Sequence, residues 1–236
     1  ISLISLRVPN DKAIDYLIRR FDELAVKHQG SSEQLGRKVV YFEDPEGQRL
    51  MLVSDQNNTG VEAGIPWSGG PVPVEYGITG LGPVRITIPE LKPTEDKLIK
   101  LMNFKHVGQY PACQEGQPDV EVYQTGAGGT GAEIHVEVRT DSPRERPGRG
   151  SVHHIAFRVK NRSELEMWHE KVNQERLPNS GIINRYYFQS LYFREPNGIL
   201  YELATDEPGF TIDEPEETLG ESLALPPFLE EKRTEI

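Results

Sequence analysis

Two residues of the C-terminal third, His154 and Glu202, could together bind a divalent metal ion. His154 lies in the strand-like segment VHHIAFRV (residues 152–159), and Glu202 lies in ILYELATD (residues 199–206). Neutral imidazole and carboxylate are ligands for divalent metals, and two His with one carboxylate suit Fe(II) oxygen chemistry. Two other readings stay open here. His154 could be a hydrogen-bonded strand histidine, and Glu202 could form an ion pair with Arg158 or Arg194.

Strand alternation assigns these residues to faces, because successive side chains of a strand point to opposite sides. His154 then shares a mixed face with Ala156, whereas His153 belongs to the apolar face that a helix would cover. Glu202 lies in mid-strand between apolar residues, and a carboxylate there is rarely buried without a partner. Tyr192, in the preceding strand, adds a phenol to the polar side.

The chain contains an internal repeat, which shows how these residues are positioned. His154 and Glu202 are 48 residues apart, and so are Leu3 and Met51. The order in both copies is strand, helix, strand, turn and strand, and the turns are EDPEG (residues 43–47) and REPNG (residues 194–198). Pro presets φ and Gly permits positive φ in such turns.

A fainter third copy lies between these two, with a strand at 79–89, a helix at 95–103 and a last strand at 131–138. The predicted fold class is α+β: βαβββ modules paired into open, cupped mixed sheets with helices on the outer face. The predicted boundaries are modules at 1–56, 79–140 and 151–206, linkers at 57–78 and 141–150, and an acidic tail at 207–236. Three is an odd number for modules that must pair, and the chain begins at Ile1 within a strand. We therefore expect a fourth module upstream of Ile1.

Composition excludes several classes of function. The 26 Lys and Arg against 37 Asp and Glu give a net charge of −11, which argues against binding to nucleic acid or to an anionic membrane surface. No apolar run reaches the roughly 18 residues of a membrane span. A single cysteine, Cys113, excludes an internal disulfide and a thiolate metal cluster, and it fits a cytoplasmic protein.

The segment LYFREPNGILYE (residues 191–202) resembles the extradiol signature of the vicinal oxygen chelate superfamily, which includes glyoxalase I, bleomycin-resistance proteins and ring-cleaving dioxygenases. VHHIAFRV and the stretch from 186 to 210 are similar to bacterial hydroquinone-type ring-cleaving dioxygenases. The resemblance implies that His154 and Glu202 are metal ligands and that a second His comes from the first module, upstream of Ile1.

The chain departs from the signature in one respect. A His is expected a few residues before Leu191, but residues 183–185 are Ile-Asn-Arg. Acid–base chemistry would then fall to Tyr192, Tyr187 or His153. In the other modules the ligand positions are Leu3, Met51 and Pro83, so those modules are predicted to be structural. We expect their remaining histidines, His28, His106 and His135, to be surface or packing residues.

The sequence thus predicts an Fe(II)-dependent extradiol-type dioxygenase, with O₂ and a small hydroquinone- or catechol-like aromatic as its reactants. Mn, Ni or Zn remain alternatives to iron. Two other functions stay open: a glyoxalase-like metal isomerase, and a non-catalytic protein that binds or sequesters a small molecule. Homo-oligomerisation is also left open.

Overall fold

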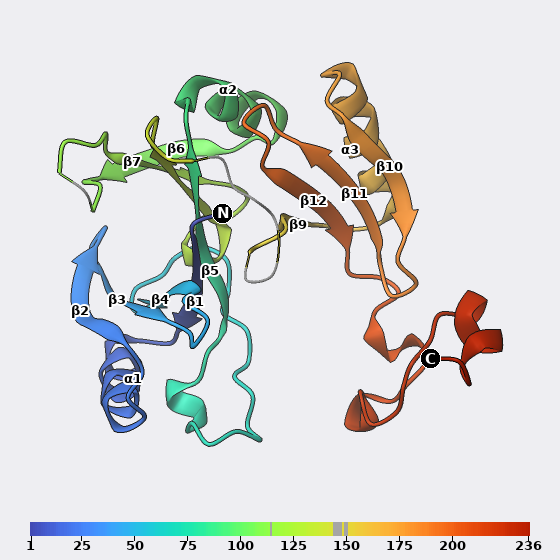
Figure 1. Cartoon of the computed structure of the whole chain (residues 1–236), viewed down its shortest axis with the longest axis horizontal. Coiled ribbons are helices and arrows are strands. Elements are labelled where there is room, and N and C mark those ends of the chain that lie inside the picture. Colours follow the sequence, from blue (N-terminus) through green and yellow to red (C-terminus); the bar gives the residue numbers. More distant parts are fainter. Residues whose placement is uncertain (114, 144–147, 149–150) are drawn as a thin grey trace. The chain divides into compact units, whose positions relative to one another are not determined.

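The computed structural model describes residues 1–113, 115–143, 148 and 151–236 (Figure 1). Two compact units make up the chain, Ile1–His153 and His154–Ile236. Each unit is built on one β-sheet. Most of the predicted linker at 141–150 lies outside the described residues.

The first unit contains an eight-stranded mixed sheet. Its strand order is β2-β3-β4-β1-β5-β8-β7-β6. The bounds in that order are His28–Gln34, Arg37–Glu43, Arg49–Ser54, Leu3–Val8, Gly80–Ile88, Glu133–Val138, Val120–Gln124 and Lys105–Tyr110. β1 pairs with β4, and β5 with β8, in parallel, while β1 and β5 pair antiparallel and join the first two modules into one sheet.

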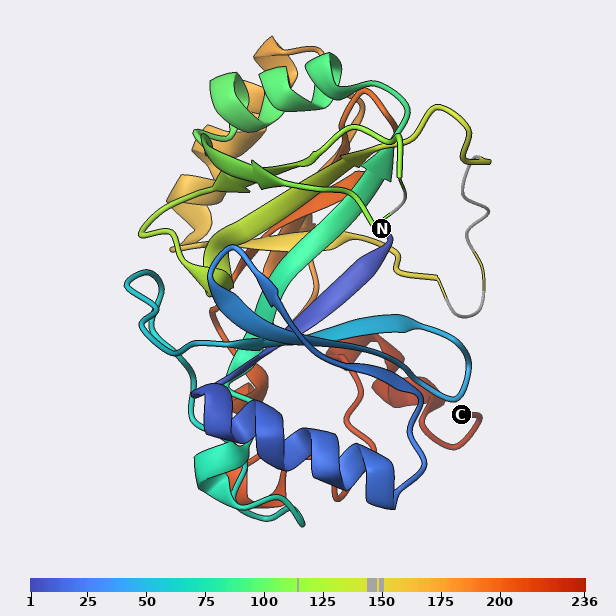
Figure 2. The same cartoon turned by 90° about the vertical axis from the view of Figure 1, so that its left-hand side faces the viewer.

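Helix α1 (Asp11–Glu23) covers the strands of the first module. Its N-terminus is capped by the side chain of Asn10, which accepts a hydrogen bond from the Ala13 amide. Ile14 and Leu17 of its apolar face are buried in a cluster with Val40 of β3. Figure 2 shows α1 (blue) running below these strands.

The second module begins its helix earlier than predicted. Helix α2 spans Leu91–Asp96 and continues into a π-helical turn at Lys97–Leu101, instead of starting at residue 95. Pro93 lies in the first turn of α2. Proline is tolerated there because the first amides of a helix have no intrahelical acceptor.

The second unit contains a four-stranded sheet with the order β10-β11-β12-β9. The bounds are Asn179–Asn184, Gln189–Arg194, Leu200–Thr205 and Ile155–Val159. Helix α3 (Arg162–Gln174) is capped by Asn161, whose side chain accepts from the Glu164 amide. One face of the sheet buries Leu191, Phe193, Tyr201 and Leu203, together with Leu165 and Val172 of α3. This is the apolar side that alternation predicts, so Glu202 lies on the other side.

The repeated turns adopt the same backbone geometry. The amide of Asp44 bonds to the carbonyl of Gln48 at 3.1 Å, and the amide of Glu195 bonds to the carbonyl of Ile199 at 3.1 Å. Gly47 has a φ of +83° and is therefore in the region that favours glycine. Mixed sheets, few helices and repeated strand–helix–strand modules confirm the predicted α+β class.

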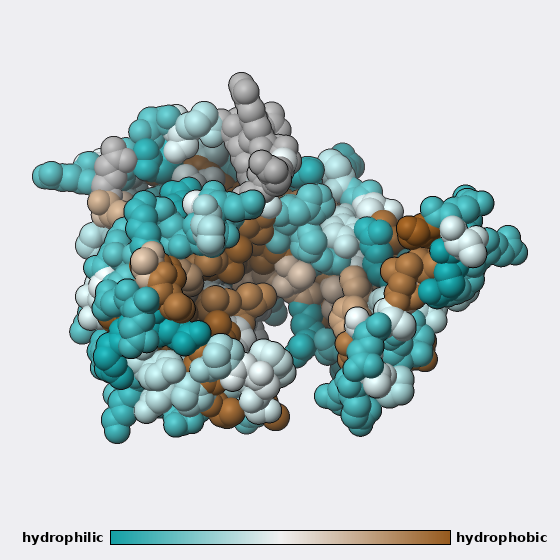
Figure 3. Space-filling model, turned by 60° about the horizontal axis from the view of Figure 1, so that its bottom comes forward, coloured by the Kyte–Doolittle hydropathy of each residue, from teal (hydrophilic) through white to brown (hydrophobic). Residues whose placement is uncertain are grey.

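Short 3-10 helices occur in the linker, the β7–β8 loop and the tail, at Val74–Tyr76, Thr130–Ala132, Phe210–Ile212, Glu216–Thr218 and Pro227–Lys232. No helix in the described part of the chain is long and apolar enough to span a membrane. Large apolar side chains reach the surface in several places, including Ile65, Trp67 and Phe228. One face of the molecule accordingly shows hydrophobic areas among the hydrophilic surface (Figure 3).

Candidate metal and active site

The imidazole of His154 and the carboxylate of Glu202 meet on the face of the four-stranded sheet opposite α3. β9 and β12 are parallel neighbours in which Glu202 lies opposite Ala156, and His154 directly precedes β9. His154 Nε2 lies 2.7 Å from Glu202 Oε2. Glu202 is only 3% exposed, whereas the imidazole is 31% exposed. The carboxylate of Glu202 is therefore buried, whereas solvent can reach the imidazole of His154.

Ser190 holds the other oxygen of this carboxylate. Its hydroxyl, fully buried on β11, donates a hydrogen bond to Glu202 Oε1. The two carboxylate oxygens thus have different partners, and the bond from Ser190 fixes the carboxylate with Oε2 toward His154. The sequence analysis missed Ser190. Its place two residues before Tyr192, on the same strand face, was the available signal.

Tyr192 and Arg185 lie beside the pair. Tyr192 is directly opposite Glu202 in the antiparallel pairing of β11 with β12. Its ring meets the ring of His154 edge to face, with centroids 5.6 Å apart. The Arg185 guanidinium carbon lies 5.3 Å from the centroid of the Tyr192 ring. A cation at this distance from a phenol ring is attracted to its face. Arg185 is one of the three residues found where the signature expects a His.

The structure places the other two candidates for acid–base chemistry differently. The hydroxyl of Tyr187 donates to Asp213 at 3.0 Å, and its ring packs against Phe210. Partial burial and the Asp213 carboxylate raise the pKa of Tyr187. His153 is exposed and ends the first unit. The structure thus brings His154, Glu202 and Tyr192 together. The hydroxyl of Tyr187 is instead hydrogen-bonded to Asp213 of the tail.

The residues present fit a divalent metal as two of its protein ligands. Donors that each lie about 2.1 Å from one ion at a right angle are about 3 Å apart, close to the 2.7 Å between His154 and Glu202. Among the described residues, no group of three His, Cys, Asp or Glu side chains could hold an ion. The site therefore supplies an imidazole and a carboxylate and leaves the remaining coordination positions to other groups.

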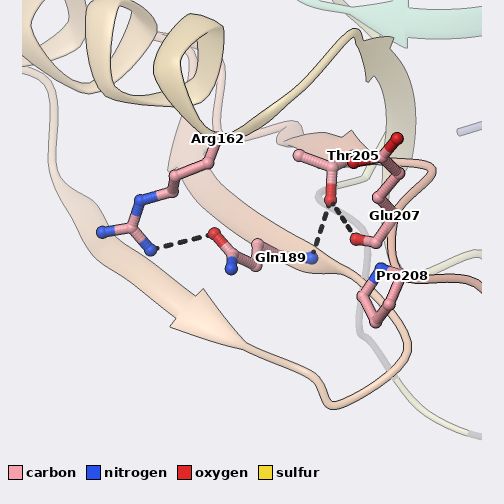
Figure 4. Close-up of a pocket in the computed structure, with 5 residues that line it drawn as sticks. All are labelled: Arg162, Gln189, Thr205, Glu207 and Pro208. Carbon is pink, nitrogen blue, oxygen red and sulfur yellow. Dashed lines mark hydrogen bonds between the residues drawn. The ribbon is translucent and has the colours of Figure 1, made fainter. Parts of the chain in front are cut away.

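A separate hollow of about 400 Å³ lies in the second unit and is lined by Arg162, Gln189, Thr205, Glu207 and Pro208 (Figure 4). The guanidinium of Arg162 donates to the side-chain oxygen of Gln189 at 2.9 Å, and the backbone N–H of Gln189 donates to the Thr205 hydroxyl at 3.0 Å. None of the predicted site residues lines it. These polar groups bond to one another and not toward the centre of the hollow. We therefore assign no ligand and no reaction to it.

The equivalent positions of the first module carry no such pair. Leu3 and Met51 are buried in an apolar cluster with Val39 and Val53.

The remaining histidines of the first two modules have carboxylate partners. His28 and His106 bond to the carboxylates of Asp22 and Glu121 near the surface. His135, in contrast, is 2% exposed and lies within a buried polar network.

The chain is similar to several proteins with dioxygenase names. It is 48% identical over all 236 residues to MhqA of Bacillus subtilis (strain 168), whose name assigns it as a ring-cleaving dioxygenase without established activity, and it spans 73% of that protein. It is 29% identical over 231 residues, 94% of this chain, to the chlorohydroquinone/hydroquinone 1,2-dioxygenase of Sphingobium indicum (strain DSM 16413), of which it spans 66%.

A solved structure supports the same relationship. The crystal structure of a Bacillus subtilis (subsp. subtilis str. 168) protein, likewise a dioxygenase by name, matches all of this chain and 71% of its own, with a TM-score of 0.84 and 32% identity. The sequence model of the Glyoxalase/Bleomycin resistance protein/Dioxygenase superfamily matches residues 80–203. Fold, sequence and relatives agree with the resemblance read from residues 191–202, and the chain belongs to the glyoxalase/bleomycin resistance/dioxygenase superfamily.

Proposed function

We propose that this chain forms part of an Fe(II)-dependent, extradiol-type ring-cleaving dioxygenase that acts on a hydroquinone- or catechol-like aromatic. The observation that carries the proposal is the 2.7 Å approach of His154 Nε2 to the buried carboxylate of Glu202. The family is metal-dependent, and relatives with dioxygenase names match the chain over 85–100% of its length.

His154 and Glu202 would hold the ion, and Ser190 would keep Glu202 in the orientation that binding needs. When bound, a divalent ion supplies Lewis-acid chemistry and a position at which O₂ and a phenol oxygen can meet. Hydrogen-bonded partners of this kind fix the direction in which a ligand points and tune its basicity. Burial of Glu202 keeps water from competing for its oxygens.

Tyr192 and Arg185 would handle the substrate. The Tyr192 ring contacts the ring of His154, and its hydroxyl would exchange a proton with a hydroxyl of the substrate ring. The guanidinium of Arg185 adds positive charge beside that phenol. A nearby cation favours the deprotonated form of a substrate hydroxyl. These two residues would take the place of the histidine that the signature expects.

A third protein ligand would complete a His/His/carboxylate set. The described residues supply only two of the three, so we expect the third to come from a part of the protein outside them. For this reason the activity belongs to the full-length protein, and experiments should use it.

The test is oxygen consumption by full-length protein loaded anaerobically with Fe(II), with hydroquinone and catechol as separate substrates. We expect one O₂ consumed per ring opened, with both oxygen atoms in the product by ¹⁸O mass spectrometry. Asp206→Asn is the matched control, because Asp206 lies just beyond the end of β12 and pairs with the exposed Arg158. Metal retention without O₂ uptake would favour the isomerase, and aromatic binding that needs no metal would favour the sequestering protein.

A further inference from the structure

The turn between β10 and β11 directs Arg185 toward Tyr192, and the repeat shows the same relationship in the first module. Tyr41 lies opposite Met51 on β4, as Tyr192 lies opposite Glu202 on β12. The two tyrosines are therefore equivalent.

The residue seven positions before each tyrosine lies at the start of a turn, and these residues are Gln34 and Arg185. In the first module, the Tyr41 hydroxyl donates a hydrogen bond to the side chain of Gln34. In the last module (151–206), the guanidinium of Arg185 lies 5.3 Å from the centroid of the Tyr192 ring. Each turn thus places the side chain that precedes it against the tyrosine.

The turn of the first module suits its own sequence. Leu35 and Gly36 connect β2 to β3, and both have positive φ, 53° and 70°. Positive φ at both central residues is the two-residue hairpin turn that matches the twist of its strands. Gly36 adopts this conformation without the steric cost that a side chain brings.

The equivalent turn of the last module contains no glycine. Its central residues are Tyr186 and Tyr187, and the Arg185 amide donates to the Phe188 carbonyl across them at 2.8 Å. Tyr186 has a φ of +72°, and the Tyr187 amide donates to the Arg185 carbonyl at 2.9 Å. The Asn184 side chain accepts from the Tyr186 amide at 2.8 Å. A three-residue turn with positive φ at its centre is the rare and strained form, so surrounding contacts must stabilise it.

The C-terminal tail supplies three contacts, all of them to Tyr187. The Gly209 amide donates to the Tyr187 carbonyl at 2.8 Å, and the Tyr187 hydroxyl donates to Asp213 at 3.0 Å. The Tyr187 ring packs on Phe210, with centroids 5.0 Å apart. Residues 209–213 therefore hold the backbone, the ring and the hydroxyl of one turn residue.

The position of Arg185 depends on this turn. Its side chain is exposed, and an exposed arginine has many rotamers, so fixing it in one direction costs conformational entropy. We propose that residues 209–213 clamp the β10–β11 turn and that Tyr187 is a positioning residue, which keeps Arg185 over Tyr192. The consequence for catalysis rests on the proposed function, in which the charge of Arg185 favours the deprotonated form of a substrate hydroxyl. The clamp itself does not depend on the reaction.

Nuclear magnetic resonance of full-length protein with ¹³C-labelled arginine tests the clamp without any reaction. The δ-methylene signal of Arg185, identified by its loss in Arg185→Met, should lie upfield of the other exposed arginines, because the face of an aromatic ring shields the nuclei above it. Asp213→Ala removes the acceptor of the Tyr187 hydroxyl and should move the signal toward its ordinary position. Glu217→Ala, which removes another exposed carboxylate of the tail, is the matched control and should leave the signal in place.

Kinetics of the iron-loaded protein test the positioning role. Tyr187→Phe should lower kcat/KM about 2- to 10-fold, the factor that one hydrogen bond is worth, with iron content unchanged. In an Arg185→Met background, Tyr187→Phe should have no further effect, because the residue through which it acts is gone. Combining Tyr186→Asn with Tyr187→Gly creates a turn that needs no clamp, and Asp213→Ala should then change neither the Arg185 signal nor kcat/KM.

Two results would overturn the proposal. One is an Arg185 signal that is not displaced in wild type or is unchanged by Asp213→Ala. The other is a loss from Tyr187→Phe that persists in full in the Arg185→Met background, because Tyr187 would then act on the fold and not through Arg185. Wild-type protein without O₂ uptake would contradict the proposed function alone, since the Arg185 signal still decides whether the clamp exists.

Discussion

The nitrogen of His154 and the oxygen of Glu202 lie 2.7 Å apart although 48 residues separate them in the chain. Parallel pairing of β9 with β12 produces this approach, since it places the start of one strand beside the middle of the other. Leu3 and Met51 have the same spacing on β1 and β4 and lie together in an apolar cluster. The same strand geometry therefore brings a polar pair together in one module and packs apolar side chains in another.

Replacing Ser190 with Ala tests how the carboxylate is held. The change leaves Glu202 Oε1 buried without its donor, so we expect a loss of about 1–3 kcal/mol in the free energy of unfolding. Metal affinity should fall about 10- to 100-fold, as is typical when a partner of a ligand is removed. A competition titration with a coloured chelator measures the affinity. Unchanged affinity in a folded Ser190→Ala protein would show that Ser190 has only a packing role.

Replacing Tyr192 with Phe separates binding from proton transfer. The ring contacts with His154 and Arg185 remain, so iron content should be unchanged, while kcat should fall about 100-fold or more. The pH dependence of kcat should also lose one limb, which loss of packing alone would not produce. Wild-type kcat in the iron-loaded Tyr192→Phe protein would remove Tyr192 from the mechanism.

Glu133 predicts a specific dependence of stability on pH. Although burial opposes ionisation, bonds from His135 and Arg37 lower the pKa of Glu133 from 4.5 to about 2. Because the folded pKa lies below the unfolded one, the stabilisation is complete above pH 4.5 and is lost as pH falls toward 2. The shift corresponds to about 3 kcal/mol.

Urea unfolding at pH 6 and pH 3 measures this effect, with Glu133→Gln as the comparison. Wild type should lose more stability than the variant between these pH values, because the variant has no carboxyl group to protonate at position 133. Equal losses would mean that the ion pair with Arg37 does not govern acid stability.

The sequence predicts the pairing of His154 with Glu202 because strand alternation and a regular repeat spacing can both be read directly from it. Glu202 and Tyr192 fall on one face by period-two alternation alone, and the structure confirms that face. His135 escapes the same reasoning, because the second module is longer between its strands and Pro83 to His135 is 52 residues rather than 48. Its correspondence to Glu202 appears only in the strand register, since His135 lies opposite Arg85 on β5 as Glu202 lies opposite Ala156 on β9.

Arg185 could not be predicted for a different reason. Arg185 follows β10 in a turn, and its approach to Tyr192 depends on the loop conformation. The early start of α2 was also not predictable from the sequence pattern. Pro93 is tolerated in the first turn of the helix, but a proline is usually taken as a residue that ends a helix.

Metal content of the full-length protein tests the central claim most directly. Glu202→Gln keeps the volume of the side chain and removes the anion, and the expected result is loss of most iron after anaerobic loading and desalting, measured per chain by atomic emission. Asp206→Asn should retain wild-type iron. Wild-type iron occupancy in a well-folded Glu202→Gln protein would contradict the assignment of His154 and Glu202 as metal ligands.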